Sequence, residues 1–158
     1  MSKNTNNISN NNRFIEITPD DVKDLMVIEC ACHSHPWSEK TFTSCIGGRY
    51  FGEKLVDKSI TTGFYIGEYV IGEATLLDIR VMPSEQGKGF GKVLLKQFLA
   101  QAKKLGATKI FLEVRAKNIP AQMLYMNAGF IEIDRRTGYY PSSSGFGYED
   151  AIVMSLSC

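Results

Sequence analysis

The chain has 158 residues, and its 18 basic and 17 acidic side chains leave a net charge of +1. A chain of this length can bury a core for one domain without help from a disulfide or a metal. The balanced charge argues against partners held by electrostatics alone, such as nucleic acid or an anionic membrane. Because no run reaches the roughly 18 apolar residues of a membrane-spanning helix and no signal region opens the chain, we expect a cytoplasmic, monomeric protein.

The N-terminal segment 1–12 contains six asparagines and almost no apolar side chain. It cannot bury enough surface to offset the entropy of ordering, so we expect a disordered tail there and one domain over 13–158. Four scattered cysteines fit a reducing compartment. The segment Cys30–His35 carries thiols and imidazoles, but residues two apart on a helix point away from each other and no second ligand pair follows. We therefore expect no metal.

Local signals organise the first third of the domain. A strand is expected at Phe14–Ile17, and a helix begins at Thr18–Asp21 with a capping threonine, a proline and two acids. One face of this helix is apolar with an acidic end and comprises Val22, Leu25, Met26 and Glu29. The segment His35–Ser38 interrupts the pattern, and a short second helix follows it. Trp37, the only tryptophan, lies in this joint and is either a packing anchor or one wall of a substrate cleft.

Periodicity in the rest of the chain predicts strands and helices. The segment Tyr50–Val81 is rich in β-branched and aromatic residues and is divided by turn residues into three antiparallel strands, of which the last is Glu73–Val81. The elements expected next are a helix from near Gly89 to Leu105, a strand at Thr108–Arg115, a helix from Asn118 to Ala128, strands at Phe130–Arg135 and Glu149–Leu156, and a loop at Thr137–Gly147. Two adjacent tyrosines in that loop, Tyr139 and Tyr140, are candidates to contact a partner.

The turn Met82–Lys92 has the composition of a phosphate-binding loop. Its glycines permit backbone conformations closed to other residues, and the free N–H groups and dipole of the following helix favour an anion. The Walker pattern fails because Val93 stands where a hydroxyl is needed, and the dinucleotide pattern fails because Lys92 replaces its last glycine. What remains is Q-x-x-G-x-G over 86–91, and a glycine turn without chemical meaning is the alternative.

This pattern resembles the pyrophosphate-binding motif of the GNAT superfamily of acetyl-coenzyme A (acetyl-CoA)-dependent N-acetyltransferases, and the order of elements over Glu73–Phe130 is that of the superfamily. Within it, the chain resembles the RimI-type ribosomal-protein alanine N-acetyltransferases. The segments that carry this likeness are His33–Lys40, Arg49–Phe51, Glu73–Leu76, Leu112–Arg115, Tyr139–Pro141 and Glu149–Ile152. The resemblance covers about Phe14 to Leu156. It implies an α/β fold of the GNAT type, with mixed α+β character, a central mixed and mostly antiparallel twisted sheet, and helices on both faces.

The resemblance also implies direct acetyl transfer from acetyl-CoA, without a metal, to the N-terminal alanine of a ribosomal protein, small-subunit protein eighteen. It places the general base on Glu113 and the general acid on Tyr125. A carboxylate can take the proton from an ammonium directly or through a water, and a phenol can donate a hydrogen bond to the departing sulfur. Taken alone, Glu113 could instead form an ion pair with Arg115 on the same strand face, and Tyr125 could be a core aromatic.

Further contacts implied by the resemblance lie on several segments. Those to the cofactor are the backbone of Ile79, Arg80 and Val81, the turn residues Gln86, Gly87, Lys88, Gly89, Phe90, Gly91 and Lys92, and the residues Asn118 and Tyr125. Relatives often carry a basic residue where this chain has Gly87, so fewer cations are expected to contact the pyrophosphate here. Trp37, Tyr139 and Tyr140 would flank a groove for an extended acceptor peptide.

Two other functions stay open from the sequence. One is an acetyltransferase for small amines such as polyamines or antibiotics, which would not be expected to carry the segments His35–Lys40 and Tyr139–Pro141. The other is a CoA-binding regulatory module without turnover, which would lack a base and an acid. An α-amine acceptor suits a single carboxylate base, since an amine of pKa about 8 is roughly a tenth neutral at about pH 7, against about one in a few thousand for lysine.

Overall fold

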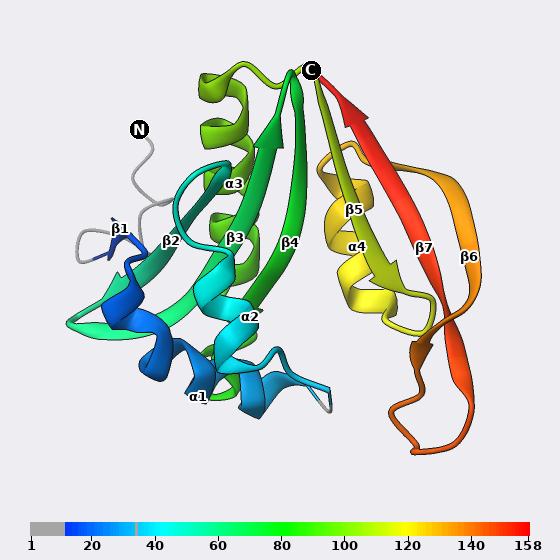
Figure 1. The fold of residues 1–158 in the computed structure, drawn as a ribbon, viewed down its shortest axis with the longest axis horizontal. Coiled ribbons are helices and arrows are strands. Elements are labelled where there is room, and N and C mark those ends of the chain that lie inside the picture. Colours follow the sequence, from blue (N-terminus) through cyan, green and yellow to red (C-terminus); the bar gives the residue numbers. More distant parts are fainter. Residues whose placement is uncertain (1–11, 34) are drawn as a thin grey trace. The chain divides into compact units, whose positions relative to one another are not determined.

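The computed structural model describes residues 12–33 and 35–158 and is shown in Figure 1. The strands in chain order are β1 (Asn12–Glu16), β2 (Tyr50–Asp57), β3 (Ile60–Val70), β4 (Glu73–Val81), β5 (Lys109–Arg115), β6 (Ile131–Pro141) and β7 (Tyr148–Ser157). The helices are α1 (Val22–Cys32), α2 (Glu39–Ser44), α3 (Phe90–Leu105) and α4 (Ile119–Asn127), with short 3₁₀ turns η2 (Pro19–Asp21) and η3 (Pro83–Glu85). The predicted tail was one residue too long, because Asn12 pairs with Asp57 in β1; the rest of that tail lies outside the described residues.

The described strands follow the hydrogen-bonded order β1-β2-β3-β4-β5-β7-β6. The pair β4 and β5 is parallel over Glu73–Leu76 and Lys109–Leu112, whereas β7 pairs antiparallel with both β5 and β6. The protein is therefore a mixed α/β protein with a mostly antiparallel seven-stranded sheet, as the sequence predicted. The chain divides into two compact units, which are described separately: unit 1 runs to Ile66 and includes Asp78–Leu95, and unit 2 comprises Gly67–Leu77 and Lys96–Cys158.

Unit 1 has a core of aliphatic and aromatic side chains from α1, α2, β2 and β3. Its fully buried members include Leu25, Ile28, Phe42, Leu55, Phe64 and Tyr65. The predicted apolar face of α1 is confirmed, and its acidic end, Glu29, is 1% exposed. Because a carboxylate is costly to bury without partners, Glu29 must be held by hydrogen bonds or charge.

Unit 2 is built on β5, whose side chains alternate strictly. Ile110, Leu112 and Val114 are buried, whereas Glu113 and Arg115 on the other face are partly exposed. The core also includes Phe98, Ala102, Phe130 and Met154. The Asn118 side chain accepts a hydrogen bond from the Ala121 N–H at 3.2 Å, so the predicted cap of α4 is confirmed.

The predicted loop Thr137–Gly147 was too long. Strand β6 continues to Pro141, and Tyr140 and Pro141 pair with Glu149 and Tyr148 of β7. The register of β6 shifts between Arg136 and Tyr140. A bulge of this kind inserts extra residues into one strand and re-aims its side chains, which a local sequence pattern does not reveal.

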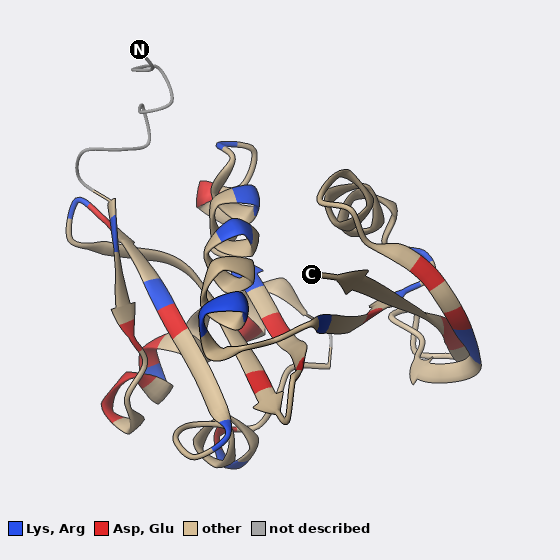
Figure 2. Ribbon diagram, turned by 90° about the horizontal axis from the view of Figure 1, so that it is seen from above, with Lys and Arg blue, Asp and Glu red and all other residues tan. Residues whose placement is uncertain are grey.

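Charged residues of both signs are distributed along the chain, as Figure 2 shows, in keeping with the net charge of +1. Helix α3 is the exception, since it carries Lys92, Lys96, Lys103 and Lys104 and no acid. Among the described residues, no helix is long and apolar enough to span a membrane.

Candidate active site

The glycine turn adopts the backbone conformation that its composition predicts. Gly87 has φ +81° and Gly89 has φ +88°, in the left-handed region that disfavours side chains. A Cβ added at either position would meet no atom within 4 Å, so the backbone borders open space there. The Val93 N–H donates to the Gly89 carbonyl at 3.2 Å, which makes Gly89 the start of α3. An anion can approach this turn closely.

Side chains of the turn bind one another and the end of β4. Lys88 Nζ lies 3.1 Å from Glu85 Oε1, so part of its charge is already balanced within the turn. Gln86 Nε2 donates to the Val81 carbonyl at 3.1 Å. The glutamine of the motif therefore ties the turn to the strand that precedes it.

The strand residues predicted to contact the cofactor, Ile79 to Val81, lie past the last parallel pair of β4 and β5, which is Leu76 with Leu112. On β3, Gly63 lies so close that an added Cβ would be 2.5 Å from the Arg80 carbonyl oxygen and 2.8 Å from Leu94 Cδ1. No side chain fits there, so the glycine at position 63 allows β3 to lie close to both the end of β4 and α3.

Glu113, the predicted base, lies on β5 with its side chain 29% exposed. Its Oε2 accepts from Arg136 Nε at 3.1 Å, and the Arg136 guanidinium lies 4.9 Å from the centre of the Tyr139 ring. The alternative reading of Glu113, an ion pair with Arg115, is therefore wrong about the partner. Glu113 is instead joined through Arg136 to a tyrosine predicted to contact the acceptor.

Arg115 contacts Tyr140, the second tyrosine predicted to contact the acceptor peptide. Its Nη1 donates to the Pro141 carbonyl at 2.7 Å and to Glu149 Oε1 at 3.1 Å, and its guanidinium lies 4.5 Å from the centre of the Tyr140 ring. Glu149 is 7% exposed, and its Oε2 also accepts from the Lys117 N–H at 3.2 Å. The end of β5 thus holds the end of β6 by a partly buried, charge-assisted network.

The bulge in β6 is fixed by a separate contact. The Gly138 N–H donates to Asp150 Oδ1 at 3.0 Å, with φ +61° at Gly138. This hydrogen bond, together with the ion pair with Arg135 at 3.3 Å, lowers the pKa of Asp150 against the opposing effect of desolvation. Arg136 pairs with Ala151 of β7 just before this bulge, and Tyr139 lies within it.

Tyr125, the predicted acid, is 6% exposed in α4, and its ring lies 6.0 Å from that of Phe130 in an edge-on arrangement. Before it in the helix, the Gln122 side-chain amide donates to the carbonyls of Arg115, Ala116 and Asn118 at 2.8 to 3.3 Å. Gln122 therefore fixes the connection from β5 to α4, the two elements that carry Glu113 and Tyr125.

Trp37 follows α1 in unit 1. Its backbone N–H donates to Glu29 Oε2 at 3.0 Å, and its ring packs edge-on against Phe42 with centroids 5.2 Å apart. The indole is only partly buried. The packing reading of Trp37 is confirmed by the contact with Phe42, and its place in the wall of a substrate cleft stays a prediction.

In the segment Cys30–His35, where we expect no metal, two of the thiol and imidazole side chains have other partners. Cys32 Sγ donates to the Val81 carbonyl at 3.1 Å, and His33 Nδ1 accepts from the His35 N–H at 2.8 Å. Over residues 12–33 and 35–158, no three side chains of His, Cys, Asp or Glu gather in a geometry that could hold a metal ion.

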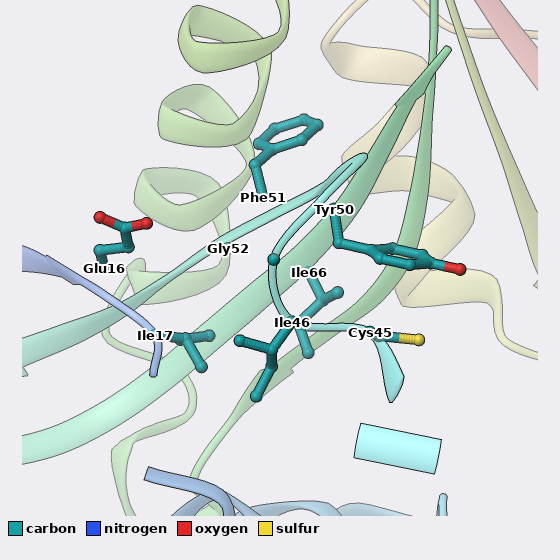
Figure 3. Close-up of a pocket in the computed structure, with 9 residues that line it drawn as sticks. Glu16, Ile17, Cys45, Ile46, Tyr50, Phe51, Gly52 and Ile66 are labelled. Atoms are coloured by element: carbon teal, nitrogen blue, oxygen red, sulfur yellow. The ribbon is translucent and has the colours of Figure 1, made fainter. Parts of the chain in front are cut away.

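A small cavity in unit 1, drawn in Figure 3, is separate from these residues. It has a volume of about 20 Å³ and is lined by Glu16, Ile17, Cys45, Ile46, Gly47, Tyr50, Phe51, Gly52 and Ile66. This is room for about one water and far below the several hundred Å³ of a ligand pocket. None of the residues predicted for the site lines it.

The chain matches known proteins over most of its length. The sequence pattern of the Acetyltransferase (GNAT) family matches residues 22–130. This chain belongs to the GNAT acetyltransferase family. The acetyltransferase is 43% identical over 135 residues to the ribosomal protein bS18-alanine N-acetyltransferase of Haemophilus influenzae, which covers 85% of this chain and 91% of that protein. Its Escherichia coli counterpart is 43% identical over 82% of this chain and 86% of its own.

Solved structures agree. The crystal structure of the ribosomal-protein-S18-alanine N-acetyltransferase from Escherichia coli superposes on this acetyltransferase with TM-score 0.88 at 39% identity, covering 92% of this chain and 93% of that one. Arabidopsis thaliana NAA60 in complex with acetyl-CoA gives TM-score 0.82 at 19% identity, over 92% and 98% of the two chains. The second likeness shows the fold alone.

Several residues of the acetyltransferase's site were not predicted. Arg136, Glu149 and Gln122 orient predicted residues, and Glu29 holds the backbone of Trp37. The contacts of Arg136 with Glu113, of Glu149 with Arg115 and of Glu29 with Trp37 join residues 8 to 34 positions apart, and those of Gln122 join residues 4 to 7 positions apart. The periodicity of a single helix or strand gives no signal for most of them. The predicted cofactor residues of the turn and β4 lie in unit 1, whereas Glu113, Tyr125, Asn118 and the two tyrosines lie in unit 2.

Proposed function

We propose that this enzyme transfers the acetyl group of acetyl-CoA to the α-amine of the N-terminal alanine of ribosomal protein bS18. The observation that carries the proposal is the 43% identity, over more than four-fifths of the chain, to two bacterial enzymes named for that reaction. We further propose that the enzyme is cytoplasmic, because its acceptor is a ribosomal protein.

The glycine turn is suited to binding acetyl-CoA, the donor of the acetyl group. Two positive-φ glycines with open space beside them, at the start of α3, suit the pyrophosphate of CoA, and exposed Lys92 adds a cation one turn into the helix. Bound acetyl-CoA supplies the thioester from which acetyl is transferred. Ile79 to Val81, past the end of the β4–β5 pairing, would offer backbone groups to its pantetheine arm.

The proposed mechanism assigns one proton transfer to each of two residues. Glu113 takes a proton from the α-ammonium, directly or through a water, so that the neutral nitrogen can attack the thioester carbon. Tyr125 donates its phenolic proton to the sulfur as the carbon–sulfur bond breaks, so coenzyme A leaves as the thiol, and the proton released by the product nitrogen restores the phenol. Arg136 keeps the Glu113 carboxylate in place before the acceptor binds, at the side where Tyr139 lies.

The acceptor class follows from the same geometry. One half-buried carboxylate paired with an arginine suits an amine that loses its proton easily, and an α-amine is neutral far more often than lysine near neutral pH. The small-amine alternative has weaker support, because spermidine acetyltransferases resemble this chain at only 21% identity or less, which shows the fold alone.

The decisive experiment is acetylation of synthetic peptides followed by intact-mass spectrometry. The enzyme is incubated with acetyl-CoA and an N-terminal bS18 peptide that begins with alanine, with the same peptide blocked at its N-terminus and retaining its lysines, or with spermidine. We expect acetyl incorporation into the first substrate only. Equal incorporation into the blocked peptide would refute the α-amine assignment, and a preference for spermidine would favour the small-amine alternative.

A further inference from the structure

A cluster of three charged side chains lies buried at the end of β4 and is not used by the mechanism above. Arg80 Nε is 3.2 Å from Glu29 Oε1 on α1 and 3.0 Å from Asp78 Oδ1 on β4. The two carboxyl side chains are 1% and 2% exposed, and Arg80 is 25% exposed. Two carboxylates against one guanidinium would leave one buried negative charge uncompensated, which is costly.

A proton on Asp78 removes this excess charge. Burial raises the pKa of Asp78 well above its usual range, and its hydrogen bond with Glu29 raises it further, against the opposing charge of Arg80. Burial also acts to raise the pKa of Glu29, but hydrogen bonds from Asp78, the Trp37 N–H and Arg80 outweigh it and lower that pKa. Among the described residues, Asp78 Oδ2 is buried without a hydrogen-bond partner, so an ionised Asp78 would leave one oxygen of its charge unsolvated.

Glu29 is the link from this cluster to Trp37. One of its oxygens accepts from Arg80 on β4, and the other accepts from the Trp37 N–H at 3.0 Å. The neighbouring Cys32 donates to the Val81 carbonyl, so the last turn of α1 is fixed to two consecutive residues of β4. The position of the Trp37 backbone therefore depends on the Glu29 carboxylate. The other partners of Glu29 lie on β4, the strand predicted to hold the cofactor.

We propose that Asp78 and Glu29 are positioning residues, which Arg80 holds together and through which the Trp37 backbone is fixed beside the end of β4, and that they thereby shape the binding site of the acceptor peptide. Arg80 balances the remaining charge. The claim about the acceptor rests on the proposed function, whereas the claim that the pair positions Trp37 does not. Because Trp37 is the only tryptophan, its fluorescence reports on this one position.

The proposal predicts a response to rising pH. When Asp78 loses its proton, two carboxylates repel each other across one guanidinium, and Glu29 holds Trp37 less firmly. The stabilising contribution of Asp78 is full below about pH 4 and is lost as pH rises through its raised pKa. The other titratable groups facing the pair are Arg80 and the Cys32 thiol, whose pKa is raised by burial and by both carboxylates against the effect of Arg80.

The first test measures Trp37 emission and thermal stability of the full chain from about pH 5 to about pH 9. Glu29→Ala should shift and broaden the emission at every pH, whereas Asp24→Ala, which removes an exposed carboxylate from the same helix, should leave the wild-type spectrum. Asp78→Asn keeps a donor for Glu29 and cannot ionise, so its emission should match the acidic wild-type spectrum throughout. Cys32→Ser removes the thiol, so a pH-dependent change in Trp37 emission that persists in this variant is not caused by ionisation of Cys32.

The second test is steady-state kinetics with the bS18 peptide. Loss of a hydrogen bond to a charged group should raise the KM for the peptide about tenfold in folded Glu29→Ala, with kcat and the KM for acetyl-CoA within about threefold of wild type. Asp78→Asn should retain the wild-type KM. A Glu29→Ala variant with unchanged Trp37 emission would overturn the positioning claim, even if no peptide is acetylated. Unchanged peptide KM with altered emission would overturn the claim about the acceptor site.

Discussion

Arg136 joins Glu113, the proposed base, to Tyr139, which is predicted to contact the acceptor peptide. Its Nε lies 3.1 Å from Glu113 Oε2, and its guanidinium lies 4.9 Å from the centre of the Tyr139 ring. The two charged side chains are 51% and 29% exposed. An ion pair this accessible to water contributes little to stability, at most about 1 kcal/mol. Its consequence is orientation: Arg136 holds the Glu113 carboxylate while its guanidinium stays against the Tyr139 ring.

The first prediction separates catalysis from stability at Glu113. Glu113→Gln keeps the shape and a hydrogen-bond acceptor for Arg136 but loses the basicity, so kcat should fall by about 100- to 10,000-fold. The free energy of unfolding should change by no more than about 1 kcal/mol. Chemical denaturation and peptide acetylation measure the two quantities, and Glu132→Gln, on the exposed face of β6, is the control. Near-normal turnover of Glu113→Gln would require another base.

The second prediction concerns the hydroxyl of Tyr125. Tyr125→Phe keeps the buried ring and its edge-on contact with Phe130, so the variant should fold and bind acetyl-CoA as the wild type does. A thiol of pKa about 8.5 leaves easily, so the loss in kcat should be smaller than that of Glu113→Gln, about tenfold. Parallel kinetics of the two variants measure this. A larger loss at Tyr125 than at Glu113 would reverse the proposed ranking.

Sequence patterns predicted those parts of the site that depend on neighbours in the chain. The positive φ values of Gly87 and Gly89 and the Asn118 cap follow from local chemistry that a short pattern contains. The alternation of β5 likewise placed Glu113 on the face opposite Ile110 and Leu112. These features need no knowledge of distant segments.

Contacts between distant segments could not be predicted in the same way. Arg136 reaches Glu113 across β7, on which Arg136 pairs with Ala151 and Glu113 pairs with Val153. Tyr140 lies in β6 because it pairs with Glu149, which follows it in the chain. The acid on α1 meets Arg80, 51 residues later. Side-chain periodicity shows that Glu29 shares the buried face of α1, but it does not show which cation or N–H will satisfy it.

The third prediction tests the glycine turn. Gly89→Ala places a methyl group in the space open to a ligand and forces a side chain into φ +88°. The strain should lower the free energy of unfolding by about 1 to 2 kcal/mol, and acetyl-CoA should bind about tenfold more weakly. Gly145→Ala is a matched control, because Gly145 has φ +90° and is equally open. Calorimetry should show strain in both variants and a loss of affinity only in Gly89→Ala; equal affinities would contradict a role of the turn in binding CoA.

The last prediction concerns the way in which Glu149 supports the end of β6, which carries Tyr140. Arg115 and Glu149 are 16% and 6% exposed, and Glu149 accepts from both the Arg115 guanidinium and the Lys117 N–H. Glu149→Gln leaves the buried charge of Arg115 without its counter-ion, so the free energy of unfolding should fall by about 3 kcal/mol.

Glu149→Gln should weaken binding of the acceptor peptide and leave binding of acetyl-CoA unchanged. Arg115 contacts both the Pro141 carbonyl and the Tyr140 ring, so a displaced guanidinium releases the end of β6 that carries the predicted acceptor residues. We expect a higher KM for the bS18 peptide and an unchanged dissociation constant for acetyl-CoA, measured at a temperature where the variant is folded. Glu132→Gln serves again as the control. If folded Glu149→Gln binds the peptide as the wild type does, Tyr140 and the end of β6 are not part of the acceptor site.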